Sequence, residues 1–105
     1  MTLEETVSLA IKEAISLPAK IAKFPVGEMS LESSLFDSSY LEFLDTQIRL
    51  APRGPEWTAR LRRRRAELAP FCNRPLIRGA PRSDNSWFTI YVDPEANCII
   101  HWEIY

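Results

Sequence analysis

Polar and apolar side chains alternate most clearly in residues 87–105, which read WFTIYVDPEANCIIHWEIY. β-branched and aromatic residues fill both ends of this stretch, and residues 93–97 between them have the composition of a turn. Pro94 presets φ, and Asn97 tolerates the left-handed conformation. The pattern predicts a β-hairpin.

Alternation divides the predicted hairpin into two faces. One face is apolar and is expected to lie against a core; it carries Phe88, Ile90, Val92, Cys98, Ile100, Trp102 and Ile104. The other face mixes rings with polar groups; it carries Trp87, Thr89, Tyr91, Ile99, His101, Glu103 and Tyr105. Amphipathic aromatic residues beside polar groups are typical of protein interfaces. The second face is therefore the candidate binding surface.

A capping box opens the first predicted helix, which covers residues 2–16. Thr2 and Glu5 supply its two side chains, and apolar residues follow at helical spacing. Pro18 limits the helix. The spacing predicts one buried stripe and one solvated stripe.

Two further helices are predicted in the middle of the chain. Residues 39–50 begin with a second capping box, formed by Ser39 and Glu42. Residues 56–68 follow Pro55, which suits the first turn of a helix.

The connecting segments have weaker patterns. Residues 19–28 are expected to form a loop that holds a few apolar side chains, residues 29–36 fit either a helical turn or a loop, and residues 75–78 favour a short edge strand. Helices first and strands last indicate the α+β class, with three N-terminal helices packed on a small C-terminal antiparallel β-hairpin or three-stranded sheet. Residues 1–105 are expected to form a single domain.

The composition is that of an ordinary globular protein, with 46% hydrophobic and 26% charged residues. No run approaches the roughly 18 apolar residues of a membrane span, and the N-terminus has no signal pattern, so we expect a cytoplasmic protein without a membrane partner. Cys72 and Cys98 are expected to be free thiols in a reducing compartment.

The formal net charge is only −1, but charge is unevenly distributed. Residues 1–48 carry three Lys against eight acids, residues 49–82 carry ten Arg against two acids, and residues 83–105 carry four acids and no Lys or Arg. This acidic, basic, acidic order indicates either a partner of complementary charge or a basic segment that lies against the chain's own acidic segments.

Arginines gather in the third predicted helix. At the helical turn of about 100° per residue, four consecutive arginines span about 300°, so at least one must lie beside the buried stripe. A basic helix also neutralises phosphates. The alternative function is therefore a nucleic-acid-binding regulator that uses Arg60, Arg62, Arg63, Arg64 and Arg65.

Catalytic and cofactor patterns are weak. His101 is the only histidine, and Glu103 lies on the same strand face about 7 Å away by strand geometry, so a general base oriented by a carboxylate is conceivable. No nucleophile motif accompanies the pair. The chain offers no metal-ligand spacing and no glycine-rich phosphate loop, so we expect neither an enzyme nor a cofactor or metal.

In its size, its helices-then-hairpin layout and its aromatic and acidic end, the chain resembles the small cytosolic immunity proteins of bacterial polymorphic-toxin and contact-dependent growth inhibition systems. The resemblance implies a tight one-to-one complex with a toxin domain, commonly a nuclease. It identifies no individual residue. The expected function is a non-catalytic immunity or antitoxin-like inhibitor, and the expected partner-binding residues are Trp87, Tyr91, Asp93, Glu95, His101, Glu103 and Tyr105.

Overall fold

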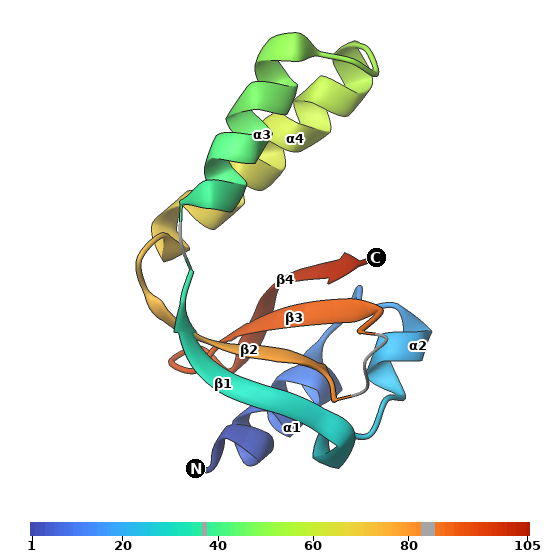
Figure 1. Cartoon of the computed structure of the whole chain (residues 1–105), viewed down its shortest axis with the longest axis vertical. Coiled ribbons are helices and arrows are strands. Elements are labelled where there is room, and N and C mark those ends of the chain that lie inside the picture. The colour runs from blue at the N-terminus through green and yellow to red at the C-terminus, as the bar shows by residue number, and fades with distance from the viewer. Residues whose placement is uncertain (37, 83–85) are drawn as a thin grey trace. The chain divides into compact units, whose positions relative to one another are not determined.

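The computed structural model describes residues 1–36, 38–82 and 86–105. It divides into two compact units (Figure 1). The sheet unit comprises Met1–Ser34 and Pro75–Tyr105, and the helical hairpin unit comprises Leu35–Arg74.

An antiparallel sheet in the order β1-β2-β3-β4 forms the centre of the sheet unit. Its strands are β1 (Met29–Leu35), β2 (Pro75–Pro81), β3 (Phe88–Asp93) and β4 (Cys98–Ile104). Strands that are neighbours in the sheet are not all neighbours in sequence, because the whole helical hairpin unit lies between β1 and β2 along the chain.

Three helical segments precede the sheet: α1 (Leu3–Glu13), the short α2 (Ala19–Ala22) and the 3-10 turn η1 (Val26–Glu28). The predicted capping box is confirmed, since the Thr2 side chain accepts from the Glu5 amide while Glu5 accepts from the Thr2 amide. Helix α1 lies across one face of the sheet (Figure 1). The buried cluster between them consists of Val7, Ala10, Ile21, Met29, Ile77, Phe88, Ile90 and Val92.

The prediction of an α+β protein is confirmed, but the predicted arrangement was wrong. The sheet has four strands, and helices and strands are interleaved along the chain rather than segregated. The strand that the pattern did not reveal is β1. Most of this edge strand is exposed or half-buried, and its sequence, MSLESSL, accordingly holds three serines and one glutamate. The alternation of polar and apolar residues in β1 is therefore weak.

Strand β2 was predicted as a short edge strand but is a seven-residue interior strand. The absence of a side chain at Gly79 allows β2 to lie between its two neighbouring strands. A Cβ at Gly79 would lie 3.0 Å from Leu31 Cδ2 and 3.2 Å from Ile90 Cγ1, so the missing side chain lets the neighbouring strands fill the space above it.

A β-bulge changes the faces of β4. Tyr91 pairs with His101 but Val92 pairs with Ile99, which leaves Ile100 as an extra residue. Ile99 therefore packs against the core although alternation placed it on the outer face, and Cys98, expected inside, is exposed.

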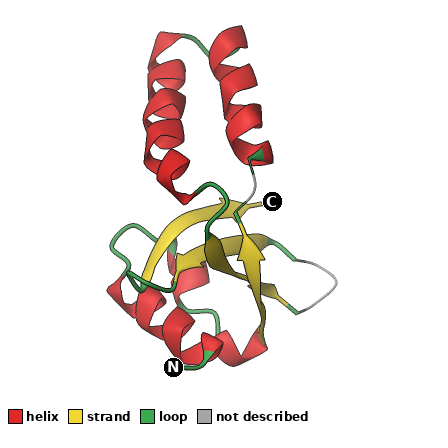
Figure 2. Cartoon of the chain, turned by 90° about the vertical axis from the view of Figure 1, so that its left-hand side faces the viewer, coloured by secondary structure: helices red, strands yellow, loops and turns green. Residues whose placement is uncertain are grey.

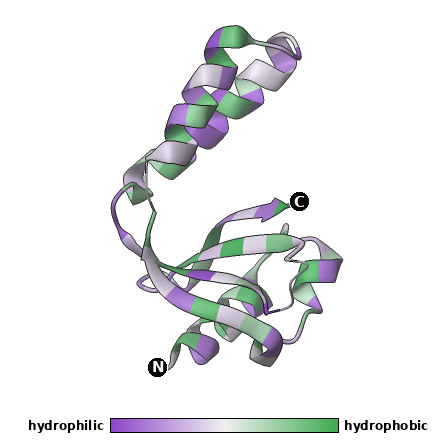
Figure 3. Cartoon of the chain, in the orientation of Figure 1, coloured by the Kyte–Doolittle hydropathy of each residue, from purple (hydrophilic) through white to green (hydrophobic). Residues whose placement is uncertain are grey.

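The helical hairpin unit consists of α3 (Ser39–Leu50), α4 (Pro55–Leu68) and the 3-10 turn η2 (Ala69–Phe71). Helices α3 and α4 lie side by side and run in opposite directions (Figure 2). Figure 3 shows hydrophilic and hydrophobic positions interspersed along both helices. The buried residues are Leu41 and Leu44 in α3, and Thr58 and Leu68 in α4.

The ends of these helices only partly follow the prediction. Pro55 occupies the first turn of α4 as expected. The capping box of Ser39 and Glu42 was wrong, because the cap of α3 is Ser38 and its side chain makes no capping hydrogen bond. Ser38 has helical φ and ψ rather than the extended geometry that a side-chain cap requires.

Within the part of the chain that the structure describes, none of the helices has the length and apolarity needed to cross a lipid bilayer.

Candidate functional site

A chain of hydrogen-bonded side chains crosses β3 and β4 on the sheet face opposite the buried cluster. The His101 Nε2 atom lies 3.1 Å from Glu103 Oε1, the Tyr105 hydroxyl donates to Glu103 Oε2 at 3.0 Å, and the Thr89 hydroxyl lies 2.9 Å from the Tyr105 hydroxyl. The register explains this proximity, because Thr89 pairs with Glu103 directly across the strands. We call these four residues the β4 network.

The direction of each hydrogen bond follows from the ionised carboxylate of Glu103, which only accepts. His101 must then carry its hydrogen on Nε2. Tyr105 donates to Glu103, so its remaining lone pair accepts the hydrogen of Thr89. The network fixes the Tyr105 hydroxyl from two sides.

Exposure is lowest at the two ends of the β4 network and highest in its middle. Thr89 is fully buried and His101 is 3% exposed, whereas the Glu103 side chain is 30% exposed and Tyr105 is 69% exposed. The Tyr91 ring stacks on the His101 imidazole with 5.9 Å between ring centroids. The network therefore presents the Glu103 carboxylate and the Tyr105 ring to solvent, while hydrogen bonds to the buried His101 and Thr89 hold them in place.

The hydroxyl end of Tyr105 is shielded although most of the residue is exposed. Desolvation, the largest cause, raises the pKa of Tyr105, and the hydrogen bond and negative charge of Glu103 raise it further, while the hydrogen bond with Thr89 lowers it. The phenol consequently remains a neutral donor at physiological pH.

The other predicted partner-binding residues of the hairpin lie outside the β4 network. Trp87 precedes β3, and its ring packs against the core with edge-to-face contacts to Phe24 and Phe88. Asp93 is 4% exposed, and its Oδ1 accepts from the Glu95 amide, which shapes the turn. Glu95 is exposed at the turn itself.

Thr89 is the network residue that was not predicted as a site residue. Alternation places it on the polar face, but it lies opposite Glu103 only because the bulge at Ile100 shifts the register by one residue. The sequence pattern therefore gives the face of Thr89 but neither its cross-strand partner nor its hydrogen bonds.

The predicted nucleic-acid-binding arginines divide into two groups on α4. Arg64 and Arg65 lie beside the buried stripe, as expected for four consecutive arginines on a helix, whereas Arg60, Arg62 and Arg63 are exposed. Among the described residues, these last three arginines form no ion pair.

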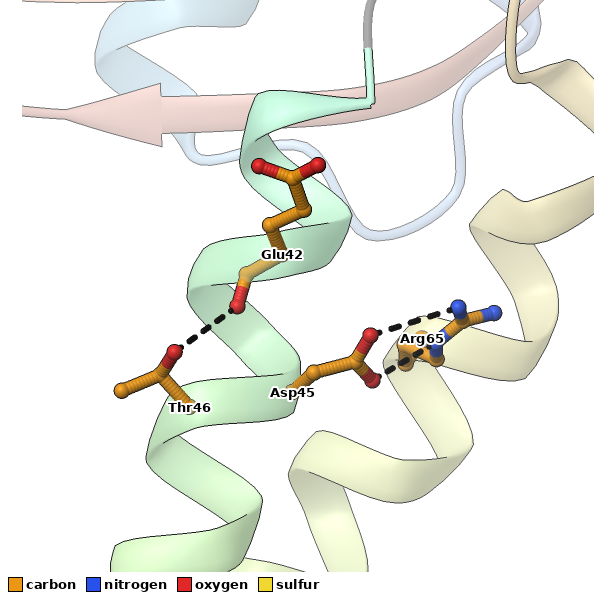
Figure 4. Close-up of polar contacts among 4 residues, drawn as sticks. All are labelled: Glu42, Asp45, Thr46 and Arg65. Carbon is orange, nitrogen blue, oxygen red and sulfur yellow. Dashed lines mark hydrogen bonds and ion pairs between the residues drawn. The ribbon is translucent and has the colours of Figure 1, made fainter.

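Arg65 connects the two helices of the hairpin. Its Nε and Nη2 atoms donate to the two carboxylate oxygens of Asp45 at 2.9 and 3.4 Å (Figure 4). This pair raises the pKa of Arg65 above its ordinary value, mainly through the hydrogen bond to Asp45. Arg65–Asp45 and Arg78–Glu32 each join an arginine of the basic segment to an acid of the N-terminal segment, so part of the charge segregation is satisfied internally.

Two exposed features of the helical hairpin unit were not predicted from the sequence. Phe43 is 55% exposed and stacks on Tyr40 with 6.1 Å between ring centroids. The Arg53 guanidinium lies 5.0 Å from the ring centroid of Trp57. Such a cation–π contact orients the arginine side chain.

The thiols and acids offer little catalytic chemistry. Although Cys98 is exposed, partial desolvation of its thiol raises its pKa, and the nearby charge of Asp93 raises it further, so its reactive thiolate is disfavoured at neutral pH. Cys72 and Cys98 are both free thiols. Across the described ranges, no group of three or more His, Cys, Asp or Glu side chains is placed to hold a metal ion.

No protein-family model matches the chain, and neither a curated protein nor a solved structure matches it. The assignment of a function therefore depends on the residues of the candidate site.

Proposed function

We propose that this protein is a non-catalytic binding protein that recognises a protein partner through Glu103 and Tyr105, the more exposed residues of the β4 network. We propose further that it acts as an immunity or antitoxin-like inhibitor, forming a tight complex with a bacterial toxin domain such as a nuclease. One observation carries the binding proposal: Tyr105 and Glu103 are held in place by hydrogen bonds to buried partners and yet remain accessible.

Preorganisation is the physical reason why this arrangement suits binding. A free tyrosine or glutamate loses rotamer freedom when it enters an interface, and that loss weakens the complex. In the β4 network, much of this freedom is already lost in the unbound protein, because Thr89 and His101 fix the two exposed groups. Tyrosine is also among the residues that most often dominate binding energy.

Charge indicates the kind of surface that the partner presents. The sheet unit carries five Lys and Arg against nine Asp and Glu, a formal charge of −4. A basic surface, such as the substrate-binding cleft of a nuclease, would be attracted to it and would associate rapidly.

Co-expression with the protein encoded by the neighbouring gene tests this proposal. We expect the two proteins to co-purify and the cells to be protected from growth arrest by that neighbour. Absence of both effects would contradict the proposed function.

Surface variants locate the contact. Tyr105→Ala and Glu103→Gln should weaken the complex about tenfold or more, in line with the loss of an interface residue of this class. Ile15→Ala, at an almost fully exposed position outside the network, and Glu13→Gln, which removes one exposed charge from α1, serve as controls and should leave affinity unchanged.

The alternative function is a nucleic-acid-binding regulator, and the exposure of Arg60, Arg62 and Arg63 favours it. Binding to a short DNA or RNA duplex at low salt should then weaken steeply with added salt, and replacement of these three arginines by Gln should flatten that dependence. A control with the same loss of charge replaces three lysines of the sheet unit, namely Lys12, Lys20 and Lys23. No retardation at low salt would exclude this alternative.

A further inference from the structure

The two outer strands of the sheet differ in how well they resist pairing with another chain. β1 carries three serines and Glu32, which forms an ion pair with Arg78 on the neighbouring strand. β4 has the sequence CIIHWEI, with one acid and neither Lys nor Pro. Natural edge strands usually carry charges, prolines or bulges that prevent such pairing. β4 has a bulge near its start, but residues 101–105 pair regularly with β3, and Glu103 is the only acidic residue among them.

The outer edge of β4 presents backbone groups that β3 does not use. Tyr105 donates its amide to the Trp87 carbonyl, which makes this a hydrogen-bonded pair. Because such pairs alternate in an antiparallel ladder, Glu103 and His101 also face β3, whereas the N–H and C=O groups of Trp102 and Ile104 point away from it. Within the described part of the chain, these outward groups of Trp102 and Ile104 have no hydrogen-bond partner.

We propose that the free edge of β4 binds an extended, basic segment of the partner protein, which adds to the sheet as a fifth strand. This inference rests on the proposed function, since it concerns the same partner and the same strand. Trp102 and Ile104 supply the backbone hydrogen bonds, and alternate side chains of the added strand contact the two faces of β4.

The side chains of β4 determine the composition of that segment. On one face, the added strand lies next to Trp102 and Ile104, the second of which is 51% exposed, so apolar residues suit these positions. On the other face it lies next to Glu103, whose side chain is 30% exposed. A Lys or Arg there would complement Glu103 and the formal charge of −4 of the sheet unit.

Residue-resolved amide exchange tests the free edge directly, with a short peptide of alternating valine and lysine as the probe. In the free protein, the amides of Trp102 and Ile104 should exchange at least about tenfold faster than those of His101 and Glu103, because only the latter are paired. Excess peptide should slow exchange at Trp102 and Ile104 at least about tenfold. Slow exchange at these two amides in the free protein, or no slowing with the peptide, would overturn the proposal.

A matched pair of variants separates the contribution of the backbone N–H of residue 104 to peptide binding from that of its side chain. Ile104→Pro removes an outward N–H without removing any hydrogen bond to β3, and should weaken peptide binding about tenfold. Ile104→Ala removes the same side chain but keeps the N–H, and should bind more tightly than the proline variant. Equal affinities of the two variants would contradict backbone pairing, and amide exchange of the unaltered protein decides the question if Ile104→Pro does not fold.

Three controls show which molecule pairs with the β4 edge, and whether a negative result contradicts the edge proposal or the proposed function. A peptide of alternating valine and glutamate should bind at least about tenfold more weakly than the lysine peptide, since it places like charge beside Glu103. A concentration-dependent dimer that Ile104→Pro abolishes would assign the edge to a second copy and overturn the proposal. If the neighbouring protein binds and protects cells but leaves the Trp102 and Ile104 amides unprotected, the edge proposal fails while the proposed function stands.

Discussion

The sheet unit and the helical hairpin unit bury apolar surface to different extents. In the sheet unit, eight buried residues from three strands and two helices form one cluster. In the helical hairpin unit, the buried apolar residues of α3 and α4 are Leu41, Leu44 and Leu68, while Phe43 and Leu50 on α3 are 55% and 62% exposed. The hairpin is therefore expected to open locally at a lower free energy than the sheet.

The sheet unit and the helical hairpin unit also differ in formal charge. The helical hairpin unit carries eight Arg against five acids, a formal charge of +3, whereas the sheet unit carries −4. The near-neutral total thus hides two regions of opposite sign. Where burial is sparse, contacts such as Asp45–Arg65 contribute a larger share of the local stability, and that share depends on salt.

The largest expected effect comes from the same substitution made in the two units. Phe88 is fully buried and contacts the rings of Phe24 and Trp87, so Phe88→Ala should lower the free energy of unfolding by about 3–5 kcal/mol. Phe43→Ala, at an exposed position of α3, should cost less than about 1 kcal/mol. Urea denaturation of both variants measures the difference, and similar losses would mean that the two units do not differ in burial as described.

A leucine pair tests whether the hairpin opens separately. Leu44 is 1% exposed, and Leu44→Ala should cost about 2–4 kcal/mol. Leu50→Ala, at a position that is 62% exposed, is the control and should be close to neutral. In amide exchange, Leu44→Ala should accelerate the amides of α3 and α4 while those of β2 and β3 keep their protection; equal acceleration in both units would show a single cooperative unit instead.

The features that the sequence predicted well are local ones. The capping box of Thr2 and Glu5 depends on residues three apart, and the left-handed Asn97, with φ of 52°, depends on the turn alone. Both follow from the chemistry of a few neighbouring side chains. The α+β class and the three longer helices follow in the same way from periodicity.

The features that the sequence did not predict depend on tertiary context. β1 is a strand only because β2, distant in sequence, pairs with it, and its serines hide the alternation. A strict period of two cannot reveal the extra residue Ile100, so the faces of Cys98 and Ile99 were misassigned. In the candidate site, alternation correctly grouped His101, Glu103 and Tyr105, but Trp87 turned to Phe24 in the core because it lies before the strand begins.

Glycine substitutions compare backbone requirements in the two units. Gly54 has φ of 86° and ψ of −178°, a region that other residues rarely adopt, and a Cβ there would meet no atom within 4 Å. Gly54→Ala should therefore cost about 1–3 kcal/mol through backbone strain alone. Gly27→Ala is the control, because its Cβ would make an ordinary contact 3.7 Å from Glu4 Oε1, and it should be neutral or slightly stabilising. Thermal unfolding of both variants measures the contrast.

The Asp45–Arg65 pair should have a smaller effect, because both side chains are more than a third exposed. Asp45→Asn should lower stability slightly, and the loss should shrink as salt is raised. A double-mutant cycle with Arg65→Gln isolates the pair from other effects of each substitution. A coupling that is unchanged between low and high salt would contradict an electrostatic contact at the surface.

The smallest expected effect is a pH dependence at the first turn of α1. The backbone hydrogen bond from Thr2, and then its side-chain hydrogen bond, lower the pKa of Glu5 below its ordinary value of 4.5. A lowered pKa in the folded state means that Glu5 stabilises the fold above pH 4.5 and that this contribution is lost as the pH falls through the folded-state pKa. Glu5→Gln should therefore be less stable than the unaltered protein at neutral pH, with the difference narrowing in acid. Glu4→Gln in the same turn is the control, and a pH-independent difference for Glu5→Gln would show that packing rather than the carboxylate explains the loss.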